Sequence, residues 1–503
     1  MLNLILAIIY YVIVVLTVIH VVMDNRQPAK TMAWTLVIWF VPVVGIIFYL
    51  FFGINTRKER MVSQRSLDEL SKRSMLGFAE QQDLRLPEDH KPVIDLFINQ
   101  SFSLPFKTEG IVTYTDGYQF FPALLTAISK ARSHIHIDMY IFEEDALGNL
   151  IADALIQKAR EGIEVRIIYD DVGCWNVRHR FFERMREEGI EAVPFLPVRF
   201  PQFTSKVNYR NHRKLIVIDG ETGFMGGMNI ALRYVSKTWR DTMVKITGTG
   251  VYALQRSFLI DWYFVDRTLL NDRKYYPPST LHLQPSTLHP QPSTLHPQPS
   301  TLHPQPSTLN PPPSTLNPSP STLLQVVTSS PVVPYPEIMQ GFVRIILAAK
   351  YYVYIETPYF LPTESVLFAL KTAAMAGVDV RIMVPRKNDA WFAEWAGRSY
   401  LREAAEAGVR VLLYEAGFLH SKMMVCDDNI STCGSTNVDF RSFENNFEAN
   451  VFFYGEDTAL QLKQVFLADE AQAVDLTDVP ERIRPKFSMR LLESVLRMLA
   501  PLM

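Results

Sequence analysis

The chain contains the stretch His212-Arg-Lys-Leu-Ile-Val-Ile-Asp219, followed by Gly226-Gly-Met-Asn229. It repeats this pattern in its second half as His420-Ser-Lys-Met-Met-Val-Cys-Asp427, followed by Gly434-Ser-Thr-Asn437. Relative to the histidine, both copies place Lys at +2, Asp at +7, Gly at +14 and Asn at +17. Five matched positions that occur twice indicate an internal duplication of a functional unit.

The duplication extends outward from this pattern. Ile137-Asp138 is followed by Gly162-Ile-Glu-Val-Arg-Ile167, and Ile355-Glu356 by Gly377-Val-Asp-Val-Arg-Ile382. Such β-rich runs alternate with helical stretches, among them 149–160 and 365–376, which is typical of βαβ units. The pattern predicts an α/β fold with two similar lobes, 109–272 and 336–503, each a mostly parallel β-sheet flanked by helices.

The spacing of the repeated pattern predicts a composite active site. Residues i and i+2 of a strand face the same side, so each His and its Lys should enter one cleft. Imidazole can attack phosphorus or protonate a leaving alkoxide, and lysine and asparagine donate to phosphoryl oxygens. Two facing copies would supply a nucleophile and a general acid. We predict as catalytic His212, Lys214, Asp219, His420, Lys422 and Asp427, and as supporting Asn229, Asn437, Asp241 and Glu448.

Carboxylates lie at equivalent places after the two histidines. Asp241 follows His212 by 29 residues and Glu448 follows His420 by 28, so each is expected to orient the histidine of its own lobe. Two roles stay open for Asp219 and Asp427. They could contact substrate, or they could hold the turn that follows the strand. Gly226 and Gly434 are expected to serve backbone geometry only.

The N-terminal region is strongly apolar. Residues 2–23 and 31–56 contain no Asp, Glu, Lys or Arg. Each run is long enough to cross a bilayer of about 30 Å, so residues 1–56 predict a hairpin of two transmembrane helices, 2–23 and 32–54. Basic residues after the second run favour cytoplasmic termini. Residues 57–108 are expected to form a juxtamembrane connector.

A proline-rich tract separates the lobes. Pro-Ser-Thr-Leu recurs every seven positions from Pro278 to Pro320, and two prolines in most repeats block helix and sheet alike. We expect a disordered linker over 273–335. The repeat itself explains the four regularly spaced histidines of this tract, so no metal site is predicted there. His134 and His136 lie on an apolar strand and are expected to be packed. Three cysteines without metal spacing indicate reduced thiols.

These motifs resemble the phospholipase D superfamily, and more closely the bacterial cardiolipin synthases. The resemblance rests on the duplicated motif, the N-terminal membrane pair, Trp239-Arg-Asp241, Thr357-Pro-Tyr-Phe360 and Asn437-x-Asp439-x-Arg441-Ser-Phe443. It implies that one phosphatidylglycerol passes its phosphatidyl group to His212, with His420 as the acid, and that glycerol leaves. A second phosphatidylglycerol then attacks to give cardiolipin. The resemblance implies no metal or cofactor and a place in the bacterial inner membrane, and the basic residues after the second apolar run favour catalytic lobes on its cytoplasmic side.

Other functions stay open on the sequence. Water instead of a lipid alcohol as acceptor would make the protein a membrane phospholipase D, and an inactive membrane scaffold belongs to a different class. A nucleic-acid phosphodiesterase is disfavoured by the net charge of −2. The basic, apolar stretch 481–503 fits an interfacial helix on anionic lipid or an ordinary packing helix. Neither the donor headgroup nor the oligomeric state is fixed.

Overall fold

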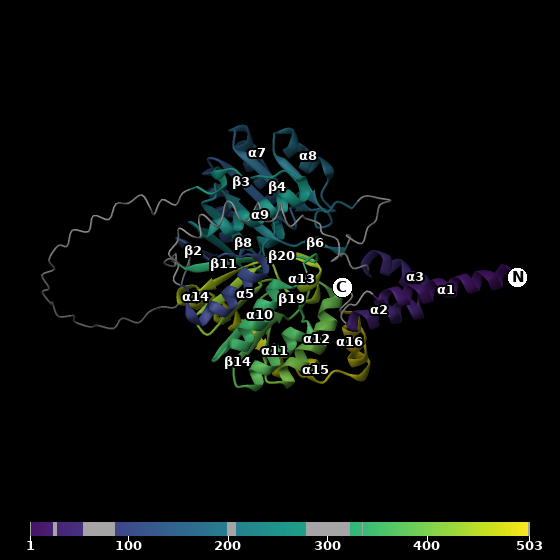
Figure 1. Cartoon of the computed structure of the whole chain (residues 1–503). Helices are drawn as coiled ribbons and strands as arrows, with labels where there is room; N and C mark the ends of the chain where they lie inside the picture. The colour runs from purple at the N-terminus through teal and green to yellow at the C-terminus, as the bar shows by residue number, and fades with distance from the viewer. Residues whose placement is uncertain are drawn as a thin grey trace, which may run out of the picture.

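The computed structural model describes residues 2–23, 28–53, 86–198, 208–277, 322–333 and 335–500. Two α/β lobes are stacked, and the N-terminal helices project from one side (Figure 1). Residues 278–321, which cover most of the repeat tract, and residues 54–85, which include 57–85 of the expected connector, lie outside the described residues, so the disorder expected for the tract stays a prediction.

The N-terminal segment forms α1 (Leu2–Met23), α2 (Pro28–Phe40), α3 (Pro42–Phe48) and the π-helix η1 (Tyr49–Gly53). The first helix has its predicted bounds. The second, predicted as continuous over 32–54, is interrupted between α2 and α3, where Pro42 has no N–H to continue the helix ladder. Within the described ranges, no helix combines the length and the apolarity needed to cross a membrane, so the predicted transmembrane hairpin has no structural support.

The first lobe is built on a seven-stranded sheet in the order β2-β10-β8-β7-β3-β4-β5. Its strands are β2 (Gly110–Tyr114), β3 (His134–Met139), β4 (Glu164–Asp170), β5 (Glu191–Phe195), β7 (Lys214–Ile218), β8 (Thr222–Gly226) and β10 (Met243–Thr247). Its helices are α6 (Gly117–Ser129), α7 (Ala146–Arg160), α8 (His179–Glu187), η4 (Leu232–Tyr234), α9 (Val251–Asp266) and η5 (Arg273–Tyr275). The helix expected over 149–160 is thus confirmed as α7.

The second lobe repeats this plan in a larger sheet ordered β1-β11-β20-β18-β17-β12-β14-β15-β21. Its strands are β1 (Phe106–Lys107), β11 (Leu323–Ser329), β12 (Tyr352–Glu356), β14 (Asp379–Pro385), β15 (Arg410–Tyr414), β17 (Met423–Cys426), β18 (Ile430–Gly434), β20 (Asn446–Tyr454) and β21 (Ala473–Asp475), with short β13 (Phe360–Leu361) and β19 (Val438–Asp439) beside it. Its helices are η2 (Glu88–His90), α5 (Lys91–Ser101), α10 (Glu337–Ala348), α11 (Glu364–Met375), α12 (Trp391–Glu406), α13 (Phe440–Glu444), α14 (Glu456–Glu470), η7 (Leu476–Asp478), α15 (Pro480–Ile483) and α16 (Phe487–Leu499). Here α11 confirms the helix expected over 365–376.

Both sheets are mixed, which corrects the expectation of mostly parallel sheets. Only β3, β4 and β5 in one lobe and β12, β14 and β15 in the other pair in parallel through helical crossovers. The motif strands β7 and β17 run antiparallel to their neighbours. The turns after Asp219 and Asp427 are too short for a parallel crossover, so each strand must fold back as a hairpin.

Segments outside the two expected lobes are built into the second one. Helix α5, which we expected within the connector 57–108, buries Val93, Ile94 and Phe97 in the core of lobe two. Strand β11, expected within the linker 273–335, is buried and pairs along its length with β20. The two lobes also share one apolar cluster, which contains Val217 from β7 and Val425 from β17. The lobes are therefore held in a fixed relationship across the active site.

Candidate active site

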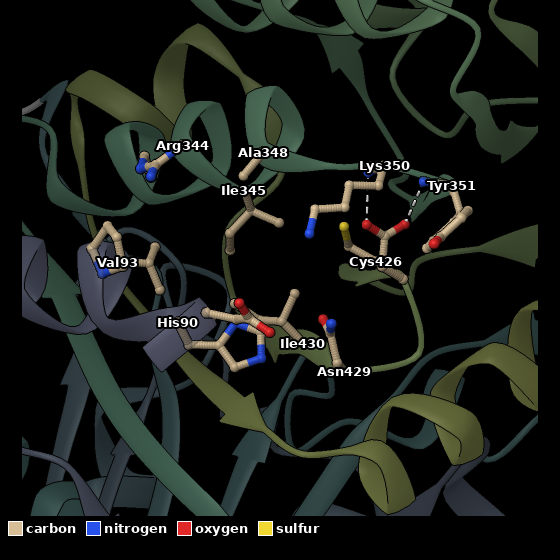
Figure 2. Close-up of a pocket in the computed structure, with 13 residues that line it drawn as sticks. His90, Val93, Arg344, Ile345, Ala348, Lys350, Tyr351, Cys426, Asn429 and Ile430 are labelled. Carbon is tan, nitrogen blue, oxygen red and sulfur yellow. Dashed lines mark hydrogen bonds between the residues drawn. The ribbon is translucent and has the colours of Figure 1, made fainter. Parts of the chain in front are cut away.

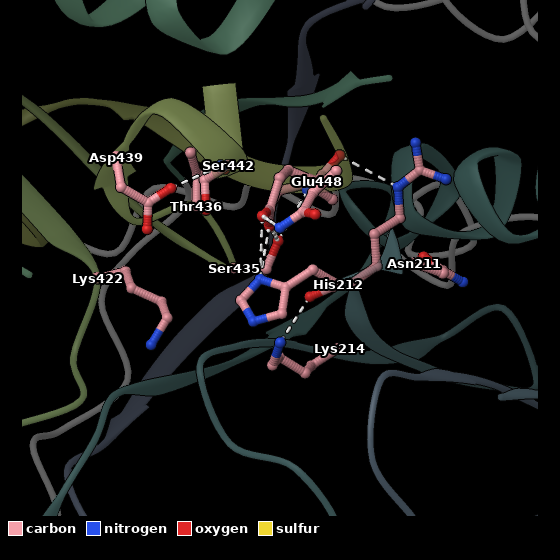
Figure 3. A network of polar contacts seen from close by, with 12 residues as sticks. Asn211, His212, Lys214, Lys422, Ser435, Thr436, Asp439, Ser442 and Glu448 are labelled. Atoms are coloured by element: carbon pink, nitrogen blue, oxygen red, sulfur yellow. Dashed lines mark hydrogen bonds and ion pairs between the residues drawn. The ribbon is translucent and has the colours of Figure 1, made fainter. Parts of the chain in front are cut away.

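His212 is held by a carboxylate from the opposite lobe. It follows β6 (Arg210–Asn211), which pairs in parallel with the start of β20, and its backbone N–H donates to Phe447 O at 2.9 Å. Its Nδ1 lies 3.0 Å from Oε1 of buried Glu448 (Figure 3). Glu448 also accepts from Ser435 Oγ at 2.5 Å and from Asn446 Nδ2 at 3.1 Å.

His420 is held in the same crossed manner. It follows β16 (Phe418–Leu419), which pairs in parallel with β9 (Trp239–Arg240) of lobe one, and its N–H donates to Arg240 O at 2.7 Å. Its Nδ1 lies 2.6 Å from Oδ2 of Asp241, whose other oxygen accepts from Thr242 N at 2.7 Å. The expected pairing within each lobe is therefore wrong: Glu448 orients His212 and Asp241 orients His420.

Glu448 and Asp241 determine which ring nitrogen of each histidine faces the space between the two His-x-Lys units. A carboxylate accepts the proton of Nδ1, so the neutral imidazole presents the lone pair of Nε2. Burial lowers the pKa of His212 to about 4, against the opposing attraction of Glu448. Burial, followed by the charge of Lys422, lowers the pKa of His420 to about 3. Both histidines are thus neutral at pH 7, and both have the tautomer of a nucleophile or base.

The two lysines lie beside both histidines. Lys214 donates to His212 O at 2.6 Å, and Lys422 bonds His420 O and lies 3.0 Å from His420 Nδ1. Each lysine also lowers the pKa of the histidine in the opposite lobe, because all four groups face one space. Burial lowers the pKa of Lys214 to about 7. Figure 3 shows Lys214 and Lys422 on two sides of the His212 ring. The arrangement places both lysine amino groups where a phosphate would lie, and the negative charge of a bound phosphate would favour their protonated forms.

Asp219 and Asp427 lie away from the space that the two histidines and two lysines share. The Asp219 carboxylate accepts from the backbone N–H groups of Arg132, Ser133 and His134 at 2.7–3.0 Å. Asp427 binds the N–H groups of residues 350, 351 and 352 in the same way, at 2.7–2.9 Å. Both carboxylates lie at the far ends of the motif strands. These contacts fit the alternative role of holding strand and turn, and they leave the predicted catalytic role of the two aspartates without support.

A cavity of about 260 Å³ lies at this far end of β17 (Figure 2). Its lining includes Lys350, Tyr351, Cys426 and Asn429 with His90 from η2, and none of the residues that surround His420. Asp427 thus lines a cavity that is separate from the surroundings of His420.

The paired asparagines and glycines differ in their contacts. Asn229 is committed to structure: its Oδ1 accepts from Ile141 N at 3.0 Å and its Nδ2 donates to Tyr234 Oη at 2.5 Å. Asn437 is buried, and its Oδ1 has no hydrogen-bond partner among the described residues. A Cβ at Gly226 or Gly434 would lie 2.4 Å or less from atoms of the neighbouring strand, which confirms their backbone role.

Sequence reasoning missed the aromatic walls of the site. Tyr140 meets the His212 ring edge-on at 4.8 Å, and Trp239 lies 5.5 Å from the His420 ring. Trp239 belongs to the motif Trp239-Arg-Asp241, but no motif in the sequence around Tyr140 marks that tyrosine. His134 and His136 are fully buried and both bond Gln255, which confirms that they are packed. All three cysteines are buried free thiols. Among the described residues no group of three or more His, Cys, Asp or Glu is arranged to hold a metal ion.

Comparisons with known proteins agree with this geometry. The family described as "Cardiolipin synthase, PLD-like domain" matches residues 124–262 and 342–469, and the family "Phospholipase_D-nuclease N-terminal" matches residues 12–53. A cardiolipin synthase of Geobacillus is 35% identical over 496 residues, covering 96% of this chain and 90% of that protein. The major cardiolipin synthase of Bacillus subtilis is 34% identical over 514 residues, covering 100% of this chain and 99% of that protein.

Among solved structures, the phosphatidylserine synthase of Haemophilus influenzae superimposes with a TM-score of 0.58 at 15% identity, covering 83% of this chain and 100% of that one. This likeness shows the shared fold. The sequence matches over nearly the whole chain and the duplicated, crossed histidine site place the chain in the cardiolipin synthase family, a family of phosphatidyltransferases within the phospholipase D superfamily.

Proposed function

We propose that the protein makes cardiolipin by moving a phosphatidyl group from one phosphatidylglycerol to the terminal hydroxyl of another. The observation that carries this proposal is the composite site. Two His-x-Lys units, each histidine oriented by a carboxylate of the opposite lobe, face one space with Lys214 and Lys422. Such a site suits exchange of one alcohol for another on a single phosphate, because the two halves can act in turn as nucleophile and acid–base group.

In the first half-reaction, the lone pair on His212 Nε2 attacks phosphorus and the bond from phosphorus to the glycerol oxygen breaks. The leaving oxygen takes a proton from His420 Nε2, and glycerol departs. In the free protein His420 is neutral at pH 7. The negative charge of the bound phosphodiester would raise the pKa of His420, and Asp241 would stabilise the imidazolium. Lys214, Lys422 and Asn437 would donate to the non-bridging oxygens.

In the second half-reaction, a hydroxyl of the next phosphatidylglycerol enters the position that glycerol left. The now neutral His420 removes its proton, the oxygen attacks phosphorus, and the bond to His212 Nε2 breaks. The product carries two phosphatidyl groups on one glycerol. Each half-reaction needs only one alcohol in the site, so the two lipids never crowd the phosphorus together.

We further propose that the N-terminal segment and α16 place the lobes at a membrane, on the cytoplasmic side. Helices α1–α3 expose many apolar side chains, such as Leu4 at 66% and Phe40 at 74%. Helix α16 exposes Phe487 at 83% and Met498 at 62%, while its Glu493 and Leu496 are buried against the lobe. In the view of Figure 1, α16 and the N-terminal helices lie on the same side of the molecule. Apolar side chains flanked by lysine and arginine are suited to anionic lipid.

The decisive experiment is product analysis by mass spectrometry with purified protein and phosphatidylglycerol as the only lipid. We expect cardiolipin and free glycerol in equal amounts. Phosphatidic acid as the main product would show that water is the acceptor and make the protein a phospholipase D. The variant His212→Ala should give neither product, and activity that survives this change would contradict the assignment of the site.

A further inference from the structure

Behind each catalytic histidine lies a buried cluster of two carboxyl groups and one guanidinium. In lobe one the carboxyls are Asp138 and Asp261, and in lobe two they are Glu356 and Asp469. The register shows that Asp138 and Glu356 are equivalent, since each pairs with the residue after the motif lysine, Leu215 or Met423. Asp261 and Asp469 are equivalent because each follows its motif histidine by 49 residues.

The guanidiniums of these clusters come from positions that are not equivalent. Arg213 is the middle residue of the first His-x-Lys unit, and the second unit has Ser421 there. Arg240 immediately precedes the carboxylate Asp241, and Phe447 precedes Glu448. Backbone hydrogen bonds confirm that Arg240 and Phe447 are counterparts, because their carbonyls accept from the N–H groups of the two catalytic histidines. The guanidinium of one cluster therefore comes from the residue after a catalytic histidine, and that of the other cluster from the residue before an orienting carboxylate.

Despite this difference in position, the two arginines make the same kinds of contact. Arg213 Nε donates to the backbone oxygen of Glu448 at 3.1 Å, and its Nη1 forms an ion pair with Asp261. Arg240 Nη1 donates to the backbone oxygen of Asp241 at 2.7 Å, and its Nε and Nη2 bind Asp469 at 2.8 and 2.7 Å. Each arginine thus joins a buried acidic pair to the residue that orients a catalytic histidine, and each link crosses between the lobes.

The neighbouring residues explain why one guanidinium suffices in each half. The Arg213 guanidinium lies over the Phe447 ring at 5.6 Å, so an aromatic side chain fills the place that Arg240 takes in the other half. In that other half the small Ser421 leaves room for Arg240, and Ser421 Oγ bonds Thr242 Oγ1 at 2.8 Å. Both Arg213 and Arg240 are at least nine-tenths buried, and each forms an ion pair with one carboxylate of its acidic pair, Asp261 or Asp469.

We propose that Arg213 and Arg240 are equivalent positioning residues, each fixing the backbone of one orienting carboxylate and thereby the Nε2 of the histidine bound to it. The proposal rests on the proposed function only in assigning those histidines to the chemistry. It implies that the position of the arginine in the sequence is interchangeable, provided that one guanidinium reaches each acidic pair.

This interchange can be tested by moving the guanidinium of lobe two to the position that it occupies in lobe one. Arg240→Phe should lower kcat at least about tenfold with little change in KM, because a misaligned acid–base group acts on turnover. Ser421→Arg alone should also lower activity, since two guanidiniums then compete for one acidic pair. The double variant Arg240→Phe/Ser421→Arg should exceed both single variants and return to within about threefold of the wild-type kcat.

Rescue by the relocated guanidinium separates positioning from general stability. The pH profile of kcat should shift in Arg240→Phe and return in the double variant. Arg166→Phe is the matched control, because Arg166 is as buried as Arg240 and its ion pairs with Glu164 and Glu191 involve neither a catalytic histidine nor a carboxylate that orients one. It should lower the melting temperature while kcat per folded molecule stays unchanged. If Arg240→Phe does not fold, Arg240→Lys serves as the reference variant.

A double variant no more active per folded molecule than its reference would overturn the inference. The proposed function fails by a different result, namely wild-type protein that hydrolyses phosphatidylglycerol without making cardiolipin. The rescue pattern can then still be measured on hydrolysis, so the two failures are distinguishable.

Discussion

Glu448 Oε1 lies 3.0 Å from Nδ1 of His212, although the two residues belong to different lobes. The reciprocal contact joins Asp241 to His420 at 2.6 Å. Neither lobe alone therefore contains both a catalytic histidine and the carboxylate that orients it. The active site exists only where the lobes meet, and the apolar cluster shared between them stabilises its geometry.

The crossed contacts predict which histidine each carboxylate controls. Glu448→Gln should change the Nδ1 resonance and the titration of His212 and leave His420 nearly unaffected, whereas Asp241→Asn should do the reverse. Histidine ¹⁵N NMR measures both. Each change should also lower kcat by about tenfold to ten-thousandfold, because the ring loses its preferred tautomer. Perturbation of the histidine in the same lobe instead would contradict the crossed arrangement.

Asp219 and Asp427 should matter for stability and not for chemistry. Replacing Asp219 by Asn removes a charge that accepts three backbone N–H groups, which should cost about 1–3 kcal/mol in the free energy of unfolding. Urea denaturation measures this loss, and Asp427→Asn should behave alike. The kcat of the folded variants should remain near that of wild type. If kcat instead fell by about a thousandfold, as expected on removal of an acid–base group such as His420, the two aspartates would be catalytic.

The motif positions and most elements were predictable from the sequence, but the partnerships of the site were not. Duplication of the motif identified His212, Lys214, His420 and Lys422, although both histidines and Lys422 lie just outside the strands on which the spacing argument placed them. The crossing depends on two very short parallel pairings between lobes, β6 with β20 and β9 with β16, which leave no periodicity to detect. A separation of 28 or 29 residues suggested contact within a lobe, whereas the sheet carries Glu448 across the interface.

The direction of the strands and the limits of the lobes were missed for related reasons. The turn after Asp219 contains Gly220 at a φ of +67°, a signal for a hairpin that was available in the sequence. Strand β11 was overlooked because its apolar run adjoins the proline-rich repeat. Its burial comes from its pairing with β20, more than a hundred residues away along the chain, and local composition does not encode such contacts.

Glu356 predicts a specific pH dependence of stability. Burial, followed by the nearby charge of Asp469, raises the pKa of Glu356 from 4.5 to about 8. The folded state therefore retains a proton that the unfolded chain releases, so the contribution of Glu356 is present at low pH and is lost as the pH rises through about 8. Glu356→Gln mimics the protonated form. From pH 6 to pH 9 the variant should become progressively more stable relative to wild type, as measured by denaturant unfolding, and an opposite trend would contradict a raised pKa.

The exposed face of α16 predicts an effect on activity at lipid surfaces. Phe487 and Leu491 are 83% and 55% exposed and one turn apart. Replacing both by Ser should raise the surface concentration of phosphatidylglycerol needed for half-maximal turnover several-fold, since each removes about 1.5–3 kcal/mol of apolar burial in lipid at most. Phe368→Ser is the matched control, because Phe368 is 65% exposed on α11. Equal effects of the control and the α16 variants would exclude a specific contact of α16 with lipid.

The covalent step predicts a phosphatidyl group on His212. A neutral His212 with Nδ1 bound by Glu448 presents Nε2 as a nucleophile, while the shorter contact of Asp241 with His420 suits a group that becomes an imidazolium during transfer. Brief incubation with labelled phosphatidylglycerol and alkaline quenching should therefore trap label on a peptide that contains His212. Two displacements should also retain the configuration at phosphorus in a chiral substrate. His420→Ala should slow departure of glycerol but not of a nitrophenol leaving group, which needs no proton. Label on the His420 peptide would reverse the two roles, and inversion at phosphorus would remove the covalent intermediate.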